Sequence, residues 1–199
     1  MPPTRSPSSP PLAPLLERSL EELRAVRRDA AALTGGLSAA QLAWSPAPGR
    51  WSMAEGVAHL NRTGRLYLDA LAHSLAGARA RGLVDRGDYR PGFVGGWMAR
   101  SMEPPPKIRF RSPRVFLPAR GAAAVDGPRE LATWRELHLE MEERIREAAG
   151  LDLRRTRVVS PASRWLRISA GDALALLLAH ERRHLWQMRR VRESGGFPG

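Results

Sequence analysis

The chain has 199 residues, enough for one domain with its own hydrophobic core, and it contains no cysteine. The lack of cysteine excludes disulfides, thiolate metal ligands and a cysteine nucleophile, and it is compatible with the reducing cytoplasm, where we expect the protein. No apolar run approaches the roughly 18–20 residues that span a bilayer, so we expect no membrane-spanning segment and no membrane partner.

The formal net charge is +12, and nearly all of the positive charge is arginine, because Lys107 is the only lysine. A basic protein suggests nucleic-acid binding. The arginines are scattered along the chain, however, often beside glutamate and without interleaved aromatic residues, as a GC-rich coding bias would produce. We therefore expect no specific nucleic-acid partner, only nonspecific adhesion to polyanions at low salt.

Residues 1–12 are rich in proline and serine and are predicted to form a disordered tail, followed by a single domain over residues 13–195. The apolar part of the tail is too short for a secretory signal. The first helix is predicted over about residues 12–33 and ends before two glycines, which commonly stop a helix. Its apolar stripe consists of Leu16, Leu20, Leu23, Val26 (or Arg27) and Ala30.

A short helical turn and a proline-stiffened loop are predicted over residues 37–51. The second helix has a clear start, because Ser52 and Glu55 have the spacing of a capping box, in which each side chain covers the other's free backbone N–H. Its apolar periodicity extends over residues 52–80. His59 falls beside the apolar stripe, at a position where a seam between helices can open to a cleft.

Residues 82–127 are the least regular part of the chain. They include the run Pro104-Pro105-Pro106, which cannot lie inside a helix. A short helix is predicted over residues 94–102, and extended segments are predicted over residues 107–111 and 115–117. We expect this long crossover to pack over the bundle, and connections of such length are often functional.

The third helix is predicted from about Pro128 to Gly150. The last helix is predicted over residues 169–193, with Ser169 as its N-cap and Asp172 in its first turn. Together these elements predict an all-α fold, a four-helix bundle with a long crossover connection between the second and third helices. Five tryptophans are expected to fill core or groove positions: Trp44, Trp51, Trp134, Trp165 and Trp186.

His180, Glu181 and His184 form the string H-E-x-x-H in the last predicted helix. The four-residue step places both imidazoles on one helix face, about 5–6 Å apart at Cβ, where they can bind one divalent ion. The same string marks zinc proteases, in which the glutamate is the general base and a third ligand follows downstream. That class is excluded here, because residues 185–199 contain no histidine. A third ligand must come from upstream.

Two parts of the chain resemble the DinB-like superfamily, which includes the YfiT-type proteins described as metal-dependent hydrolases. The first is PGRWSMAEGVAHL over residues 48–60, and the second comprises LRIS over residues 166–169 and AHERRHLWQ over residues 179–187. The order W-S-x-x-E-x-x-x-H-L before a late H-x-x-x-H-L-x-Q carries the resemblance, which covers nearly the whole chain apart from the tail.

This resemblance implies a four-helix bundle in which His59, His180 and His184 hold a divalent metal ion. It also implies a homodimer, since members of the family often pair. Some similar proteins are thiol-dependent transferases or isomerases that use low-molecular-weight bacterial thiols, so a small-molecule substrate and a thiol of this kind are the expected partners.

Three neutral imidazoles would leave such an ion with a charge of +2 and at least one open coordination position. An ion of this kind lowers the pKa of bound water to about 7 or activates a thiol as thiolate. Nickel and zinc suit imidazole best, while manganese and iron are also compatible. Glu181 and Gln187 are candidates for orienting a ligand or a water. Alternatively, Glu181 forms a buried ion pair with an arginine and Gln187 is a surface amide.

Each histidine also has a structural explanation. His59 alone could be a histidine at the edge of the core, bonded to a backbone carbonyl, and the pair His180 and His184 alone could lie on a solvated helix face. His73 and His138 have no partner at metal-binding spacing, so we expect surface or structural roles for them.

The leading functional hypothesis is a metal-dependent enzyme that acts on a small molecule, as a thiol S-transferase or a hydrolase. The alternative is a bundle that binds metal or a small ligand without turnover, or a dimerising stress-related protein. The sequence supplies no general base beyond water bound to the metal, which keeps the alternative open.

Overall fold

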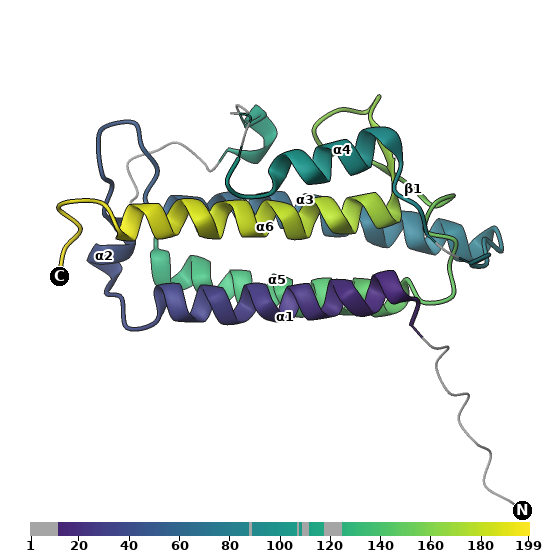
Figure 1. The fold of residues 1–199 in the computed structure, drawn as a ribbon, viewed down its shortest axis with the longest axis horizontal. Coiled ribbons are helices and arrows are strands. Elements are labelled where there is room, and N and C mark those ends of the chain that lie inside the picture. Colours follow the sequence, from purple (N-terminus) through teal and green to yellow (C-terminus); the bar gives the residue numbers. More distant parts are fainter. Residues whose placement is uncertain (1–11, 88, 107, 109–111, 118–124) are drawn as a thin grey trace, which may run out of the picture.

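The computed structural model describes residues 12–87, 89–106, 108, 112–117 and 125–199 (Figure 1). Almost all of the predicted tail over residues 1–12, and most of the predicted extended segment over residues 107–111, lie outside the described residues. The described part is mostly helical, with one small two-stranded sheet. The all-α prediction is therefore confirmed.

The bundle consists of four long helices: α1 (Pro14–Thr34), α3 (Met53–Ala80), α5 (Gly127–Glu147) and α6 (Ala170–Arg192). Helix α1 packs against α5 and α6, and α3 packs against the same two helices, so α1 and α3 occupy opposite corners. Helices α1 and α6 run in one direction, and α3 and α5 run in the other (Figure 1). A short helix, α2 (Ala39–Ala43), joins the first two long helices at the turn that the sequence predicts.

Capping fixes where α3 and α6 begin. Ser52 Oγ accepts a hydrogen bond from the Glu55 N–H at 3.1 Å, and Glu55 Oε2 accepts one from the Ser52 N–H at 2.8 Å, as the capping box predicts. Ser169 Oγ accepts from the Asp172 N–H at 3.0 Å. Each cap satisfies N–H groups that the helix leaves unpaired and contributes about 1 kcal/mol. These two helices carry the three candidate histidines.

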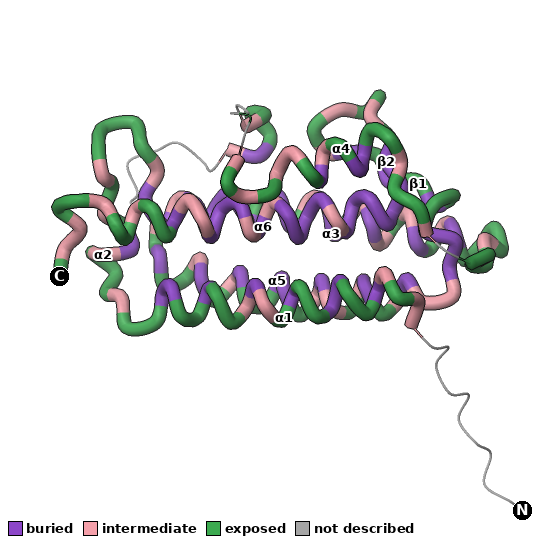
Figure 2. The backbone as a smooth tube through the Cα atoms, in the orientation of Figure 1, coloured by how far each residue is buried: buried purple, intermediate pink, exposed green. Residues whose placement is uncertain are grey.

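The core lies between the inward faces of the long helices, where the buried positions gather (Figure 2). The predicted apolar stripe of α1 is buried: Leu16, Leu20, Leu23, Val26 and Ala30. Helices α3 and α6 approach closely at Gly56, where an added Cβ would lie 3.3 Å from Met188 Cγ. Gly56 precedes His59 by about one turn, and Met188 follows His184 by about one turn. This close packing brings the histidine-bearing turns of the two helices together.

The crossover between α3 and α5 contains α4 (Phe93–Met102), which packs against α6, and a 3₁₀ turn, η1 (Arg114–Phe116), which packs against α3. The prediction of a short helix over residues 94–102 is confirmed. The prediction of an extended segment over residues 115–117 is wrong for Val115 and Phe116. Pro113 precedes the turn, and its carbonyl accepts the Phe116 N–H at 3.0 Å, which closes the turn.

A small antiparallel hairpin precedes α6 and consists of β1 (Arg157–Val159) and β2 (Arg167–Ser169). Val158 pairs with Ile168, and both side chains are buried. These strands are not predictable from the sequence, because three residues are too few to show the alternation of a strand. Among the described residues, no helix is long and apolar enough to cross a membrane.

Candidate metal centre

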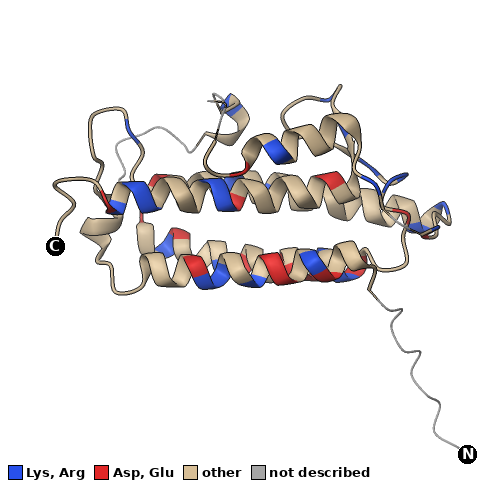
Figure 3. Cartoon of the chain, in the orientation of Figure 1, with Lys and Arg blue, Asp and Glu red and all other residues tan. Residues whose placement is uncertain are grey.

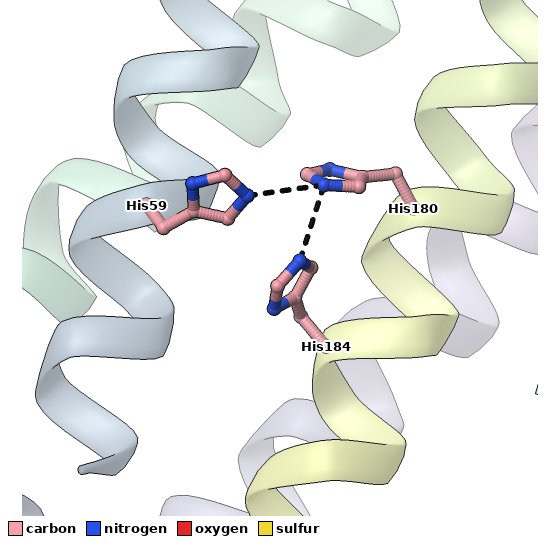
Figure 4. A group of neighbouring side chains, drawn as sticks. All are labelled: His59, His180 and His184. Atoms are coloured by element: carbon pink, nitrogen blue, oxygen red, sulfur yellow. Dashed lines mark hydrogen bonds between the residues drawn. The ribbon is translucent and has the colours of Figure 1, made fainter. Parts of the chain in front are cut away.

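The structure brings together three histidines from two helices. His59 projects from α3 toward His180 and His184, which lie one turn apart on α6 (Figure 4). His59 Nε2 lies 3.2 Å from His180 Nε2, and His184 Nε2 lies 3.1 Å from the same atom. Each ring offers a ligand atom within 4.8 Å of those of the other two rings. The three residues that the family resemblance implies as ligands form one group that could hold a metal ion.

A backbone carbonyl determines which nitrogen of His59 carries the proton. His59 Nδ1 lies 2.8 Å from the carbonyl oxygen of Phe116, at the end of η1. A carbonyl can only accept, so Nδ1 carries the hydrogen and Nε2 keeps a lone pair that faces the other two rings. The structural explanation for His59, a bond to a backbone carbonyl, is thus correct, and the same bond prepares the ring as a ligand.

The environment keeps the three rings neutral. Burial, together with the nearby His59 and Arg183, lowers the pKa of His180 to about 3. Burial, followed by the nearby His180, His59 and Arg183, places the pKa of His184 well below its ordinary value. Burial also lowers the pKa of His59, although the bond to Phe116 opposes this shift. All three rings therefore offer lone pairs at neutral pH, which is the protonation state that a metal ligand needs.

The spacing of the nitrogens fits a bound cation. Ligand nitrogens at about 2.0–2.1 Å from a metal lie about 3.3–3.4 Å apart in tetrahedral geometry and about 2.8–3.0 Å apart as octahedral neighbours. The observed separations of 3.2 and 3.1 Å lie between these values. If His180 Nε2 carried a proton, it could point at only one of the two nitrogens beside it, those of His59 and His184. A cation between the three rings would instead bind all three lone pairs. The donor set therefore fits a divalent ion but does not select tetrahedral over octahedral coordination.

Trp51 forms one wall of this site. Its ring stacks at 21° to the ring of His184 with a centroid distance of 6.2 Å, and its centroid lies 5.0 Å from that of His59. The residue is half-buried, in agreement with the predicted groove position. Trp134 is buried, whereas Trp165 is 81% exposed, so the prediction that Trp165 fills a core or groove position is wrong. It lies in the turn of the hairpin, outside the bundle.

Glu181 turns away from the three ligand rings into the core. It is buried, and its Oε2 accepts a hydrogen bond from Trp134 Nε1 at 2.9 Å. His138 Nε2 lies 3.4 Å from the same oxygen, without the alignment of a hydrogen bond, and the rings of Trp134 and His138 lie 3.7 Å apart. Among the described residues, the groups that contact this carboxylate are thus an indole and an imidazole on α5. The alternative that the sequence left open, a buried ion pair with an arginine, is not among these contacts.

The remaining candidate residues have simpler environments. His73 is exposed and His138 is buried, in agreement with the expected surface and structural roles. Gln187 is half-buried, and its role as an orienting group stays a prediction. The solvated-face explanation is wrong for His184, which is buried. The ring of Trp51 stacks on the ring of His184, and the buried Arg183 precedes His184 in the sequence.

Arg183 links the site to the crossover. Its guanidinium donates to the carbonyl oxygens of Ser101 at 3.2 Å and Ile108 at 2.9 Å. Neither this contact nor the Phe116 carbonyl could be predicted from residue types, because backbone oxygens carry no sequence signal. The position of Arg183 next to His184 is the sequence feature that indicates such contacts, since a buried guanidinium needs hydrogen-bond acceptors.

The geometry defines a class of protein: a four-helix bundle in which two helices supply three neutral histidines to one candidate metal centre. Comparison with known families identifies the group more narrowly. The chain matches the DinB superfamily over residues 22–188, which include all three histidines, and it belongs to that superfamily. Comparison with curated proteins and with solved structures gives no match.

Proposed function

We propose that the protein binds one divalent metal ion through His59, His180 and His184 and uses it in a reaction on a small molecule. The observation that carries this proposal is the convergence of three unprotonated nitrogens, with separations of 3.1 and 3.2 Å along the two measured edges. Membership of the DinB superfamily supports it. Nickel or zinc is the preferred ion, because both suit imidazole ligands, and manganese or iron also fits three neutral donors.

The reaction proposed is thiol S-transfer or hydrolysis. A divalent ion held by three imidazoles supplies Lewis acidity, which acidifies a thiol or a water molecule that binds to it. The chain contributes neutral donors in a fixed tautomer through the Phe116 carbonyl. It also contributes the flat wall of Trp51, against which an apolar part of a substrate can pack. A low-molecular-weight thiol, a homodimer and a cytoplasmic location remain predictions.

One observation favours the non-catalytic alternative, in which the bundle binds metal or a ligand without turnover. Glu181 is the carboxylate nearest in sequence to the ligand pair, but it faces the core and accepts the Trp134 indole N–H. It therefore cannot serve as a general base from its present position. Without a general base from the protein, an enzyme reaction would depend on the metal and the substrate alone. A protein that only binds metal or a ligand needs no general base.

Metal content tests the first part of the proposal. His180→Ala should lose most of the bound metal, measured by elemental analysis of purified protein, because two donors hold an ion far more weakly than three. His73→Ala is the matched control, since His73 is exposed on α3 and far along the helix from the site, and it should keep the wild-type content. Equal metal content in all three proteins would contradict the assigned ligands.

Turnover is tested separately on the metal-loaded protein. Thiol-transfer assays and ester or amide hydrolysis assays should detect an activity that is lost in His180→Ala and retained in His73→Ala. If the protein binds metal through these residues but shows no activity across this panel, the non-catalytic alternative replaces the enzyme proposal. Far-UV circular dichroism of each variant confirms that the helices are intact.

A further inference from the structure

Large apolar side chains are exposed outside the bundle on two neighbouring elements. On α4, Phe93 is 90% exposed, Val94 50% and Trp97 47%. On the hairpin, Val159 is 41% exposed and Trp165, in the turn between the strands, is 81% exposed. Helix α4 contacts β2, and Figure 1 shows α4 and the hairpin turn on the outer side of α6. We call these five residues and the elements that carry them the α4–hairpin surface.

The same surface is basic. Residues 153–171 contain no acidic residue, and α4 contains none either (Figure 3). The hairpin and its flanks carry five exposed arginines: Arg154, Arg155, Arg157, Arg164 and Arg167. None of them takes part in an ion pair with another described residue. Among the residues that the structure describes, the charge of these five arginines is therefore not neutralised by an ion pair.

The acidic residues that flank the hairpin in the sequence do not neutralise it. Asp152 is buried, and its Oδ1 accepts the backbone N–H groups of Arg154 and Arg155. Asp172 is buried as well, and its carboxylate accepts the Gly92 N–H. Both carboxylates serve the backbone inside the fold, so the arginine side chains remain available to an external anion.

Exposed aromatic rings beside arginines without ion-pair partners suit the surface of an anionic bilayer, and Arg164 lies over the Trp165 ring at 4.7 Å. Tryptophan and phenylalanine insert at the boundary between headgroups and acyl chains, while arginine binds lipid phosphates. A second copy of the chain is a poorer occupant, because a two-fold contact would place the five arginines against five more. Nucleic acid would match the arginines but leaves the aliphatic Val94 and Val159 without a role, since bases stack on aromatic rings.

We propose that the α4–hairpin surface docks on a bilayer that contains anionic lipid. The expectation of no membrane partner rested on the lack of a spanning segment, and peripheral docking requires none. This inference does not depend on the metal proposal, because it uses different residues and predicts binding with or without bound metal.

Sedimentation with lipid vesicles tests the proposal on the full chain. The wild-type protein should sediment with vesicles of phosphatidylglycerol and phosphatidylcholine in equal parts, much less with phosphatidylcholine alone, and less as salt is raised. The double variant Phe93→Ser/Trp165→Ser should lower the partition coefficient by about tenfold or more, because two inserting rings are lost. The variant Arg164→Gln/Arg167→Gln should weaken binding to the anionic vesicles.

Leu139→Ser is the matched control, because Leu139 is 60% exposed but lies on α5, outside the α4–hairpin surface. It should bind vesicles as the wild type does, and all variants should keep wild-type helicity and metal content. Three results would overturn the proposal: no sedimentation of the wild type, an equal loss in Leu139→Ser, or an effect of the double variant on duplex-DNA binding or molecular mass without an effect on vesicles.

Discussion

A buried carboxylate needs hydrogen-bond donors, and Glu181 finds them on helix α5, which lies diagonally across the core from α6. Moving an unpaired charge out of water costs several kcal/mol, on the order of the whole stability of a domain. The indole N–H of Trp134 supplies a direct hydrogen bond at 2.9 Å, and His138 lies close to the same oxygen. This hydrogen bond holds the Glu181 side chain on the side of α6 that faces the core. His180 and His184 then face α3, because they lie on another side of the helix.

Replacing Trp134 by phenylalanine tests this pairing. Phenylalanine keeps most of the ring packed against His138 but removes the donor, so the Glu181 carboxylate loses its hydrogen bond in the core. Trp134→Phe should reduce the free energy of unfolding by about 1.5–3 kcal/mol, as for a hydrogen bond to a charged group. Chemical denaturation measures the change. Trp186→Phe, at a half-buried position on α6, is the control and should cost less. Equal losses would show that Trp134 contributes packing only.

Individual residues of the site could be predicted where metal-binding side chains recur at a fixed spacing in the sequence. The four-residue step of His180 and His184 indicated a metal pair, and the family resemblance supplied His59. The partners of Glu181 were not predictable, because they depend on how α5 is rotated against α6. Trp165 was predicted wrongly for a related reason: an indole favours burial, but the sequence does not show that the hairpin turn projects from the bundle.

At the scale of elements, the first turn of α6 joins the helix to the crossover. Ser169 Oγ donates to Asp172 Oδ2 at 2.7 Å and, since its hydrogen is used there, accepts from the hydroxyl of Tyr89 at 2.8 Å. Burial raises the pKa of Tyr89, so its hydroxyl stays protonated and can donate. A Cβ added at Gly95 would lie 2.5 Å from the Asp172 side chain, so α4 can pack here only with glycine at this position.

Loss of the Ser169 cap should therefore lower the free energy of unfolding more than loss of an exposed cap. Ser169→Ala removes the N-cap of a 23-residue helix and two further hydrogen bonds, one buried and one partly buried, and it should reduce the free energy of unfolding by about 2–3 kcal/mol. Ser38→Ala removes the exposed cap of the five-residue helix α2 and should cost less than about 1 kcal/mol. Thermal and denaturant unfolding measure both. A similar loss in the two variants would contradict a buried network at Ser169.

The predictability of the elements follows their length. Long amphipathic helices and their caps carry repeated signals, so α1, α3, α5 and α6 were predicted close to their observed bounds. The two hairpin strands and the 3₁₀ turn each span three residues, and their conformations depend on contacts with the bundle. The turn at Phe116 shows the consequence for the site. The Phe116 carbonyl orients His59, yet nothing in the local sequence distinguishes the 3₁₀ turn from an extended segment.

For the whole molecule, the candidate metal centre joins parts of the chain that are far apart in sequence. His59 and His180 are separated by 121 positions, and α3 and α6 run in opposite directions in the bundle. In the unfolded chain this set of donors does not exist, since even the closely spaced pair needs a helix to share one face. A metal ion that uses all three rings must therefore bind the folded state in strong preference to the unfolded state.

Metal removal should consequently lower the thermal stability. At a free metal concentration about 100 times the Kd, binding should add about 2.7 kcal/mol to the free energy of unfolding, or roughly 5–10 °C in Tm for a chain of this length. A chelator should reverse the gain. His59→Ala and His180→Ala should each abolish it, although the two residues lie on different helices, whereas His73→Ala should retain it. If His59→Ala kept the full metal-dependent increase in Tm, the ion would be bound by α6 alone. The ion would then not link α3 to α6.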